Sequence, residues 1–99
     1  MKLTGKQLNH LRALAHHLKP IVTVGVAGAT PAVSAELENA LEAHELVKIR
    51  LPSLPKPEKK ALLAKLCQET NAAPVQLIGR IGVTYRPADA MTIDLPEMS

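Results

Sequence analysis

Aromatic side chains are almost absent from this sequence. Among its 99 residues there is no Trp and no Phe, and Tyr85 is the only tyrosine. The hydrophobic core must therefore consist of aliphatic side chains. The shortage also excludes nucleic-acid-binding modules that stack several bases on an aromatic platform.

Reactive groups are equally scarce. The single cysteine, Cys67, excludes an internal disulfide and fits a reducing compartment. It follows Leu63 at helical spacing, so we expect it to fill the core. The serines stand in no nucleophile motif, and the 4 histidines lack the spacing of metal ligands. We therefore expect no enzymatic activity, no metal, no cofactor and no small-molecule substrate.

Long apolar runs are missing as well. The longest uncharged apolar stretch, residues 21–29, contains Thr23 and two glycines and is too short to span a membrane. Residues 1–6 lack the apolar core of a signal peptide. These observations predict a cytoplasmic protein without a membrane partner.

Basic residues are absent from one part of the chain. Between Pro20 and Val47 there is no Lys or Arg, although four acids stand there. The net charge is +3, but outside this segment 12 basic residues face only the other five of the 9 acids, a balance of +7. A basic surface beside an acidic one suits a polyanion docking in a fixed orientation, although a well-solvated surface would carry the same charges.

Capping residues and apolar spacing predict three helices. The first has the capping-box spacing of Thr4 and Gln7, the second starts with Pro31 at its first position, and the third ends at a left-handed Asn71. The expected boundaries are Thr4 to Leu18 or Lys19, Thr30 onward, and about Glu58 to Thr70.

Runs of β-branched residues predict four strands, over residues 21–24, 46–51, 75–78 and 81–86. Gly79 and Gly82 indicate a tight reversal or a bulge between the last two. The order α-β-α-β-α-β-β predicts one α/β domain over residues 1–97, with a mixed four-stranded sheet and packed helices. Residues 92–95 could add a short edge strand.

A glycine loop, Gly25-Val26-Ala27-Gly28, joins the first strand to the second helix. Glycines let the backbone turn sharply and approach a phosphate closely. Free N–H groups at the following helix start favour an anion. A tight strand–helix turn needs glycines in any case, so the loop depends on its neighbours for a functional interpretation.

Basic side chains of the first helix could be the neighbours that give the loop a function. Arg12, His16 and Lys19 are spaced to share one stripe of the first helix, and Lys19 precedes Gly25 by only six residues. We therefore expect a cationic stripe close to the loop.

Basic residues on two of the strands could extend this cationic stripe. Lys48 and Arg50 project from one side of the second strand. Arg80, Thr84 and Arg86 are separated by even numbers of residues near the last strand, so they share one side of it. Exposed strand cations can also serve only to protect a sheet edge.

Several short blocks of the sequence are familiar in this order and at this spacing. They are LAHHLKP at 14–20, VG and GAT within 24–30, HELVKI at 44–49, VQLIGR at 75–80 and YRP at 85–87. Together they resemble the CRM domain (chloroplast RNA splicing and ribosome maturation), in the stand-alone bacterial form called the YhbY family. The similarity covers residues 3–87.

The resemblance implies a compact α/β fold like the C-terminal domain of bacterial translation initiation factor three. It implies RNA binding by the loop and adjacent basic residues and, for bacterial stand-alone members, association with precursors of the large ribosomal subunit and help in its assembly. The candidate RNA-binding residues are Gly25, Val26, Ala27, Gly28, Arg12, His16, Lys19, Lys48, Arg50, Arg80 and Arg86.

The loop departs from the family at its centre. The two inner residues are commonly polar or basic in the family, but here they are Val26 and Ala27. Any contact of this loop with RNA must come from its backbone amides and from neighbouring residues.

Two other functions stay open at this point. The acidic second helix, with Glu38, Glu42 and Glu45, could serve a protein–protein adaptor on the ribosome. A small enzyme would require a polar pocket with perturbed titratable groups.

Overall fold

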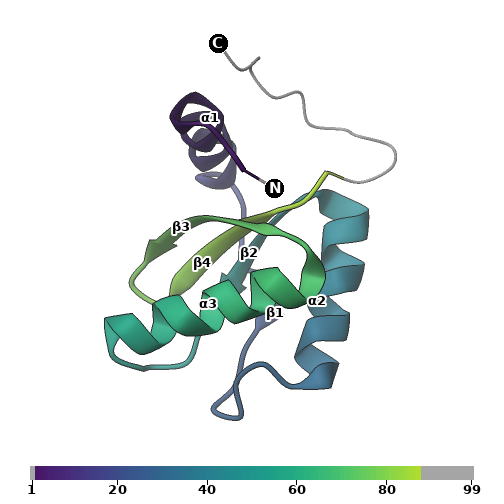
Figure 1. Cartoon of the computed structure of the whole chain (residues 1–99), viewed down its shortest axis with the longest axis vertical. Helices are drawn as coiled ribbons and strands as arrows, with labels where there is room; N and C mark the ends of the chain where they lie inside the picture. The colour runs from purple at the N-terminus through teal and green to yellow at the C-terminus, as the bar shows by residue number, and fades with distance from the viewer. Residues whose placement is uncertain (1, 88–99) are drawn as a thin grey trace.

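The computed structural model describes residues 2–87, and the strand considered at residues 92–95 lies outside them. Seven elements follow one another in the predicted order (Figure 1). They are α1 (Gly5–Ala15), β1 (Val22–Thr23), α2 (Pro31–His44), β2 (Leu46–Arg50), α3 (Lys56–Thr70), β3 (Ala73–Ile78) and β4 (Ile81–Tyr85).

The four strands form one mixed sheet, as predicted, and their order in it is β1-β2-β4-β3. β1 runs parallel to β2, whereas the β2–β4 and β4–β3 pairs are antiparallel. The tight reversal between the last two strands contains Gly79 in a left-handed conformation, with φ of 56°. The irregularity in the ladder lies between Pro74 and Gln76.

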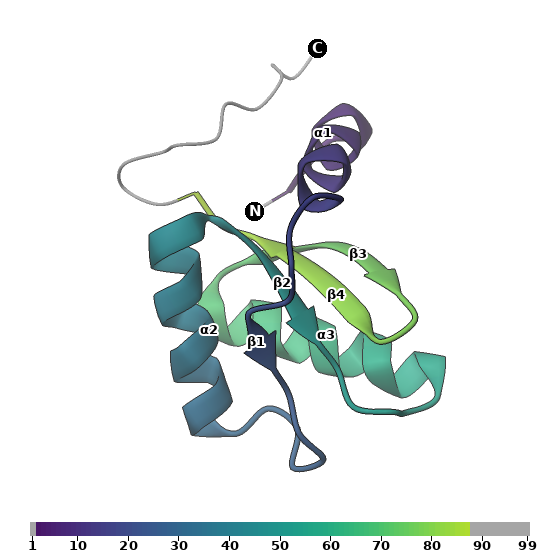
Figure 2. The same cartoon turned by 180° about the vertical axis from the view of Figure 1, so that it is seen from behind.

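The three helices cover the two faces of the sheet unequally (Figures 1 and 2). α2 and α3 pack on one face and enclose the larger apolar cluster, whereas α1 covers only one end of the other face. The larger cluster comprises Val22, Val24, Leu37, Leu41, Val47, Ile49, Leu51, Leu63, Leu66 and Cys67. The smaller cluster under α1 comprises Leu11, Ala15, Leu46, Val75, Val83 and Tyr85.

α1 begins as predicted and ends earlier than predicted. The Thr4 hydroxyl accepts from the Gln7 amide at 3.1 Å, and the Gln7 side chain accepts from the Thr4 amide at 3.0 Å. The helix stops at Ala15 because the chain tightens there, with the amide of Leu18 donating to the Ala15 carbonyl at 2.9 Å. Lys19 therefore lies beyond the helix and is not part of a helical stripe with Arg12.

The other helix ends follow the capping signals, with one exception. Thr30 caps α2 with Pro31 in its first turn, and Asn71 ends α3 with φ of 56°, as predicted. α3 begins at Lys56, about two residues before the predicted start, because Pro57 in a first turn loses no helical hydrogen bond. None of the helices within residues 2–87 is long and apolar enough to cross a membrane.

Candidate nucleic-acid interface

The glycine loop is a tight turn with an exposed apolar tip. The Gly28 amide donates to the Gly25 carbonyl at 3.0 Å, and Gly28 adopts a φ of 75°. Val26 at the tip is 99% exposed. The turn thus presents backbone and two small apolar side chains to solvent, with no charge of its own.

The helix start behind the loop offers fewer donors than the sequence predicted. Pro31 has no N–H group, and the Val33 amide donates to the Thr30 hydroxyl at 3.2 Å. The Ser34 amide donates to the Thr30 carbonyl at 3.0 Å. The amides of Gly28, Val33 and Ser34 are therefore already engaged, which leaves fewer donors at this turn for a phosphate.

The predicted proximity of the α1 cations to the loop is wrong. α1 and the loop lie at opposite ends of the molecule along its longest axis, in both views (Figures 1 and 2). The segment between them contains β1, and an extended chain rises about 3.3 Å per residue, so the six residues from Lys19 to Gly25 can span up to about 20 Å. Closeness in sequence did not produce closeness in space.

Three of the candidate cations converge on the sheet face that α1 partly covers. Arg12, His16 and Lys48 line one groove of about 280 Å³ beside α1. The Arg12 Nε–H group donates to the Val75 carbonyl at 3.2 Å, and Lys48 Nζ donates to the Leu18 carbonyl at 3.2 Å. These bonds fix both cations at the sheet while leaving several of their N–H donors for a ligand.

Arg50 extends this basic surface along β2. It is exposed and lies two residues after Lys48, on the same face of the sheet, as predicted from the strand alternation. Its partners in register are Thr23 of β1 and Ile81 of β4, so it stands in the part of the face that α1 leaves open.

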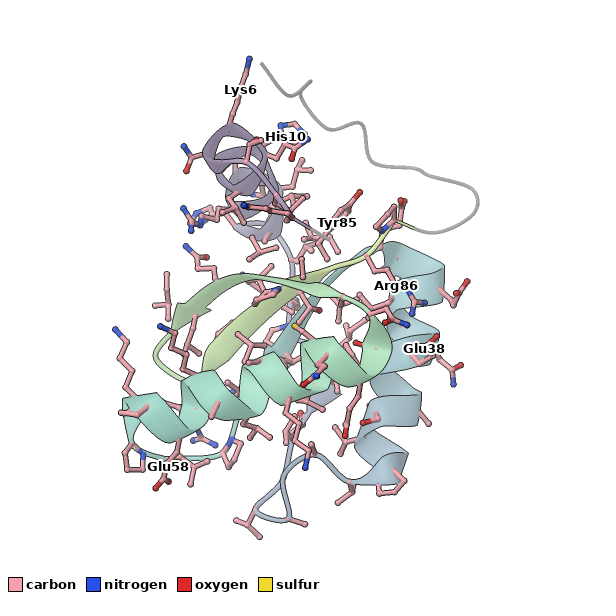
Figure 3. The ribbon with its side chains drawn as sticks, in the orientation of Figure 1. Lys6, His10, Glu38, Glu58, Tyr85 and Arg86 are labelled. Carbon is pink, nitrogen blue, oxygen red and sulfur yellow. The ribbon has the colours of Figure 1, made fainter. Side chains whose placement is uncertain are left out.

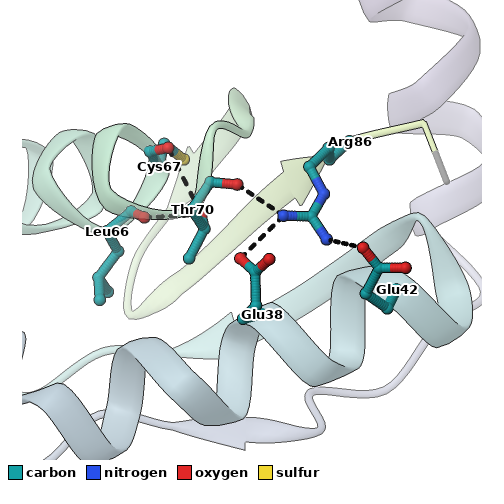
Figure 4. Close-up of polar contacts among 6 residues, drawn as sticks. All are labelled: Glu38, Glu42, Leu66, Cys67, Thr70 and Arg86. Carbon is teal, nitrogen blue, oxygen red and sulfur yellow. Dashed lines mark hydrogen bonds and ion pairs between the residues drawn. The ribbon is translucent and has the colours of Figure 1, made fainter.

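Arg86 occupies the opposite side of the sheet. One of its terminal nitrogens contacts Glu38 at 2.8 Å and donates to the Thr70 carbonyl at 2.8 Å, and the other contacts Glu42 at 2.8 Å (Figures 3 and 4). Its side chain is only 13% exposed. Arg86 therefore joins the end of β4 to α2 and α3, away from Lys48.

The contacts of Arg86 also engage the acidic residues of α2. Glu38 and Glu42 both pair with Arg86. Glu45 is 1% exposed and ends α2 with φ of 63°. The three acids considered for an adaptor thus serve the fold, which makes α2 a weaker candidate surface than the basic face.

Arg80 lies in the turn between β3 and β4. Its Nε–H group donates to the Leu51 carbonyl at 3.0 Å, and the Leu51 amide donates to the Arg80 carbonyl at 2.7 Å. Arg80 is exposed and directly precedes Ile81, which lines the groove of Arg12, His16 and Lys48, so it adds a cation at the turn end of the sheet.

The α3 lysines were missed as candidates in the sequence. Lys56 and Lys60 line a groove together with Arg12 and Gln76, at the β3 edge of the sheet. Lys59 donates to the Gly79 carbonyl at 2.7 Å. The signal was the basic content of residues 56–60, but only the packing of α3 against β3 brings Lys56 and Lys60 to the β3 edge, where they share a groove with Arg12.

The described residues contain little that catalysis could use. Burial raises the pKa of the Cys67 thiol to about 12. Burial and then the charge of Glu45 raise the pKa of Tyr85. No group of three or more potential metal ligands occurs within residues 2–87. These buried groups belong to the core.

Fold and surface together define a small α/β domain with a mixed sheet, one face closed by two helices and the other half open and basic. The sequence profile of the CRS1/YhbY (CRM) domain matches residues 3–86, and the chain belongs to this family.

Relatives from bacteria agree with this assignment. A Haemophilus influenzae protein named "RNA-binding protein" is 45% identical over 94 residues, which cover 95% of each chain. A Pseudomonas aeruginosa protein named "Probable RNA-binding protein" is 41% identical over 86 residues, 87% of this chain and 83% of the relative. The solution structure of a Staphylococcus aureus protein, described as a candidate RNA binder, matches with a TM-score of 0.85 and 35% identity, over 96% of this chain and all of the other.

Proposed function

We propose that this chain is an RNA-binding protein whose main contact surface is the half-open, basic sheet face. The observation that carries the proposal is the convergence of Arg12, His16 and Lys48 on one groove, with Arg50 beside them. Arg12 of α1 and Lys48 of β2 are held in place by bonds to backbone carbonyls. Such an array suits the phosphates of a structured RNA, which are spaced along a rigid backbone.

The glycine loop supplies a separate contact in this proposal. Gly25 and Gly28 permit close backbone approach, while Val26 and Ala27 add no charge, so this contact is weaker than that of the basic face. Lys19 and Arg80 extend the basic surface at either end. Arg86 is a structural residue because its guanidinium is engaged by two carboxylates and a carbonyl.

Within the cell we propose that the RNA belongs to precursors of the large ribosomal subunit and that binding assists their assembly in the cytoplasm. The support is membership of the CRM family. Crosslinking in cells, followed by sequencing of the bound RNA, tests this role. Enrichment of precursor large-subunit RNA is expected, and a spread over unrelated transcripts would contradict it.

RNA binding itself is tested by measuring Kd for a hairpin RNA at several salt concentrations. Phosphate contacts predict that log Kd rises linearly with log salt. The variant Lys48→Gln should bind several-fold more weakly, with a salt slope smaller by about 1. The control Lys65→Gln removes the same charge from the exposed side of α3 and should leave both quantities unchanged. Equal behaviour of the two variants would overturn the assignment of the surface.

A further inference from the structure

The half-open sheet face carries an apolar pair where a soluble domain would usually place polar groups. Ile78 of β3 and Ile81 of β4 are directly opposite each other in register, so their side chains are neighbours on one face. Ile78 is 63% exposed. Arg50 stands next in the same row, opposite Ile81 on the other side. The pair therefore forms an aliphatic platform bordered by a cation.

Polar and charged groups surround this platform. Ile78 and Ile81 line the groove of about 280 Å³ that Arg12, His16 and Lys48 also line. Gln76 completes the lining, at a half-buried position of β3. The groove thus combines an apolar floor, one amide group and three groups that can carry positive charge.

We propose that this groove holds a single unpaired nucleotide of the bound RNA, an inference that rests on the proposed RNA-binding function. The flat face of the base lies on Ile78 and Ile81, which bury it from water. The Gln76 amide both donates and accepts, so it can meet the edge of more than one base. The neighbouring phosphate lies near Arg12 and Lys48.

This arrangement makes the protein sensitive to RNA structure. In an A-form duplex the bases are stacked and paired, and side chains cannot read its narrow major groove. A base in a loop or bulge is free to leave the stack and enter the groove. The chain therefore prefers RNA with unpaired nucleotides beside a helix, although it lacks the aromatic residues that usually stack such bases.

The test compares two RNAs of equal length by fluorescence anisotropy at one salt concentration, a hairpin with an unpaired loop and a fully paired duplex. The variant Ile78→Thr removes apolar surface but keeps a β-branched residue on an edge strand, so the fold should persist. The control Ile21→Thr makes the same change at another half-exposed isoleucine, which lines a different groove.

The wild-type protein should bind the hairpin more tightly than the duplex. Ile78→Thr should weaken hairpin binding about fivefold, the lower end of what loss of a base-stacking side chain costs, and leave duplex binding unchanged. Ile21→Thr should match the wild type. Equal wild-type affinity for both RNAs, or equal effects of the two variants, would overturn the nucleotide site. Failure of the wild type to bind either RNA would instead overturn the proposed function.

Discussion

In this account Arg86 stabilises the fold and does not contact RNA, which a single substitution can test. The variant Arg86→Met keeps the apolar stem and removes the guanidinium. The lost bond to the Thr70 carbonyl is worth about 1.5–3 kcal/mol for a charged donor. The ion pairs add only about 0.5 kcal/mol together, because Glu38 and Glu42 are 46% and 61% exposed. We expect a loss of about 2–3.5 kcal/mol in the free energy of unfolding.

Urea unfolding followed by circular dichroism measures this loss. The midpoint should fall while the denaturant slope stays constant, and Tm should drop by about 10–20 °C for a domain of this size. Hairpin affinity of the folded variant should equal that of the wild type. A loss below about 1 kcal/mol, or an affinity reduced as far as in Lys48→Gln, would refute the structural role.

Three further predictions concern the packing and the loop. Gly82→Ala should lower the free energy of unfolding in urea by about 1–3 kcal/mol, because a Cβ there would lie 3.0 Å from a Leu63 methyl group. An unchanged midpoint would show that Leu63 moves aside freely. Cys67 should resist alkylation by iodoacetamide at pH 8 in the native protein, because its pKa of about 12 keeps it protonated, and should react once the protein is unfolded; rapid native labelling would contradict its burial. Gly28→Ala should cost about 1–2 kcal/mol, since its φ of 75° disfavours any Cβ, whereas Gly25→Ala, with open space around it, should cost less.

The local signals of the sequence were sufficient for the order of elements and for most helix ends. Thr4 with Gln7, Thr30 with Pro31, and Asn71 each satisfy backbone groups within a few residues, so their roles could be predicted without knowledge of the tertiary structure. The shorter α1 could not be predicted in this way. Its end depends on where the chain must turn to reach β1 beside β2.

The composition of the candidate site depended on long-range pairing. Strand alternation correctly placed Lys48 and Arg50 on one side of β2, but it could not relate that side to the side occupied by Arg86. The register decides this, because Leu46 pairs with Tyr85 and the Arg86 amide donates to the Glu45 carbonyl. Arg86 thereby reaches α2 instead of the open face.

The position of the loop shows the same limit. Arg12 and Gly25 are only 13 residues apart in the chain, yet α1 and the loop occupy opposite ends of the molecule. The α3 lysines, more than 40 residues after Arg12, share a groove with it. Which cations gather is therefore a property of the fold.

A nuclear magnetic resonance titration of the isotope-labelled protein with the hairpin RNA tests the central claim most directly. If the half-open sheet face is the RNA-binding surface, the largest amide shift changes should fall on the end of α1 around Arg12 and His16, on β2 at residues 48–50 and on β3 at residues 76–78. Smaller changes are expected at residues 25–28. Changes concentrated on the acidic surface of α2, with the sheet face unaffected, would contradict the account.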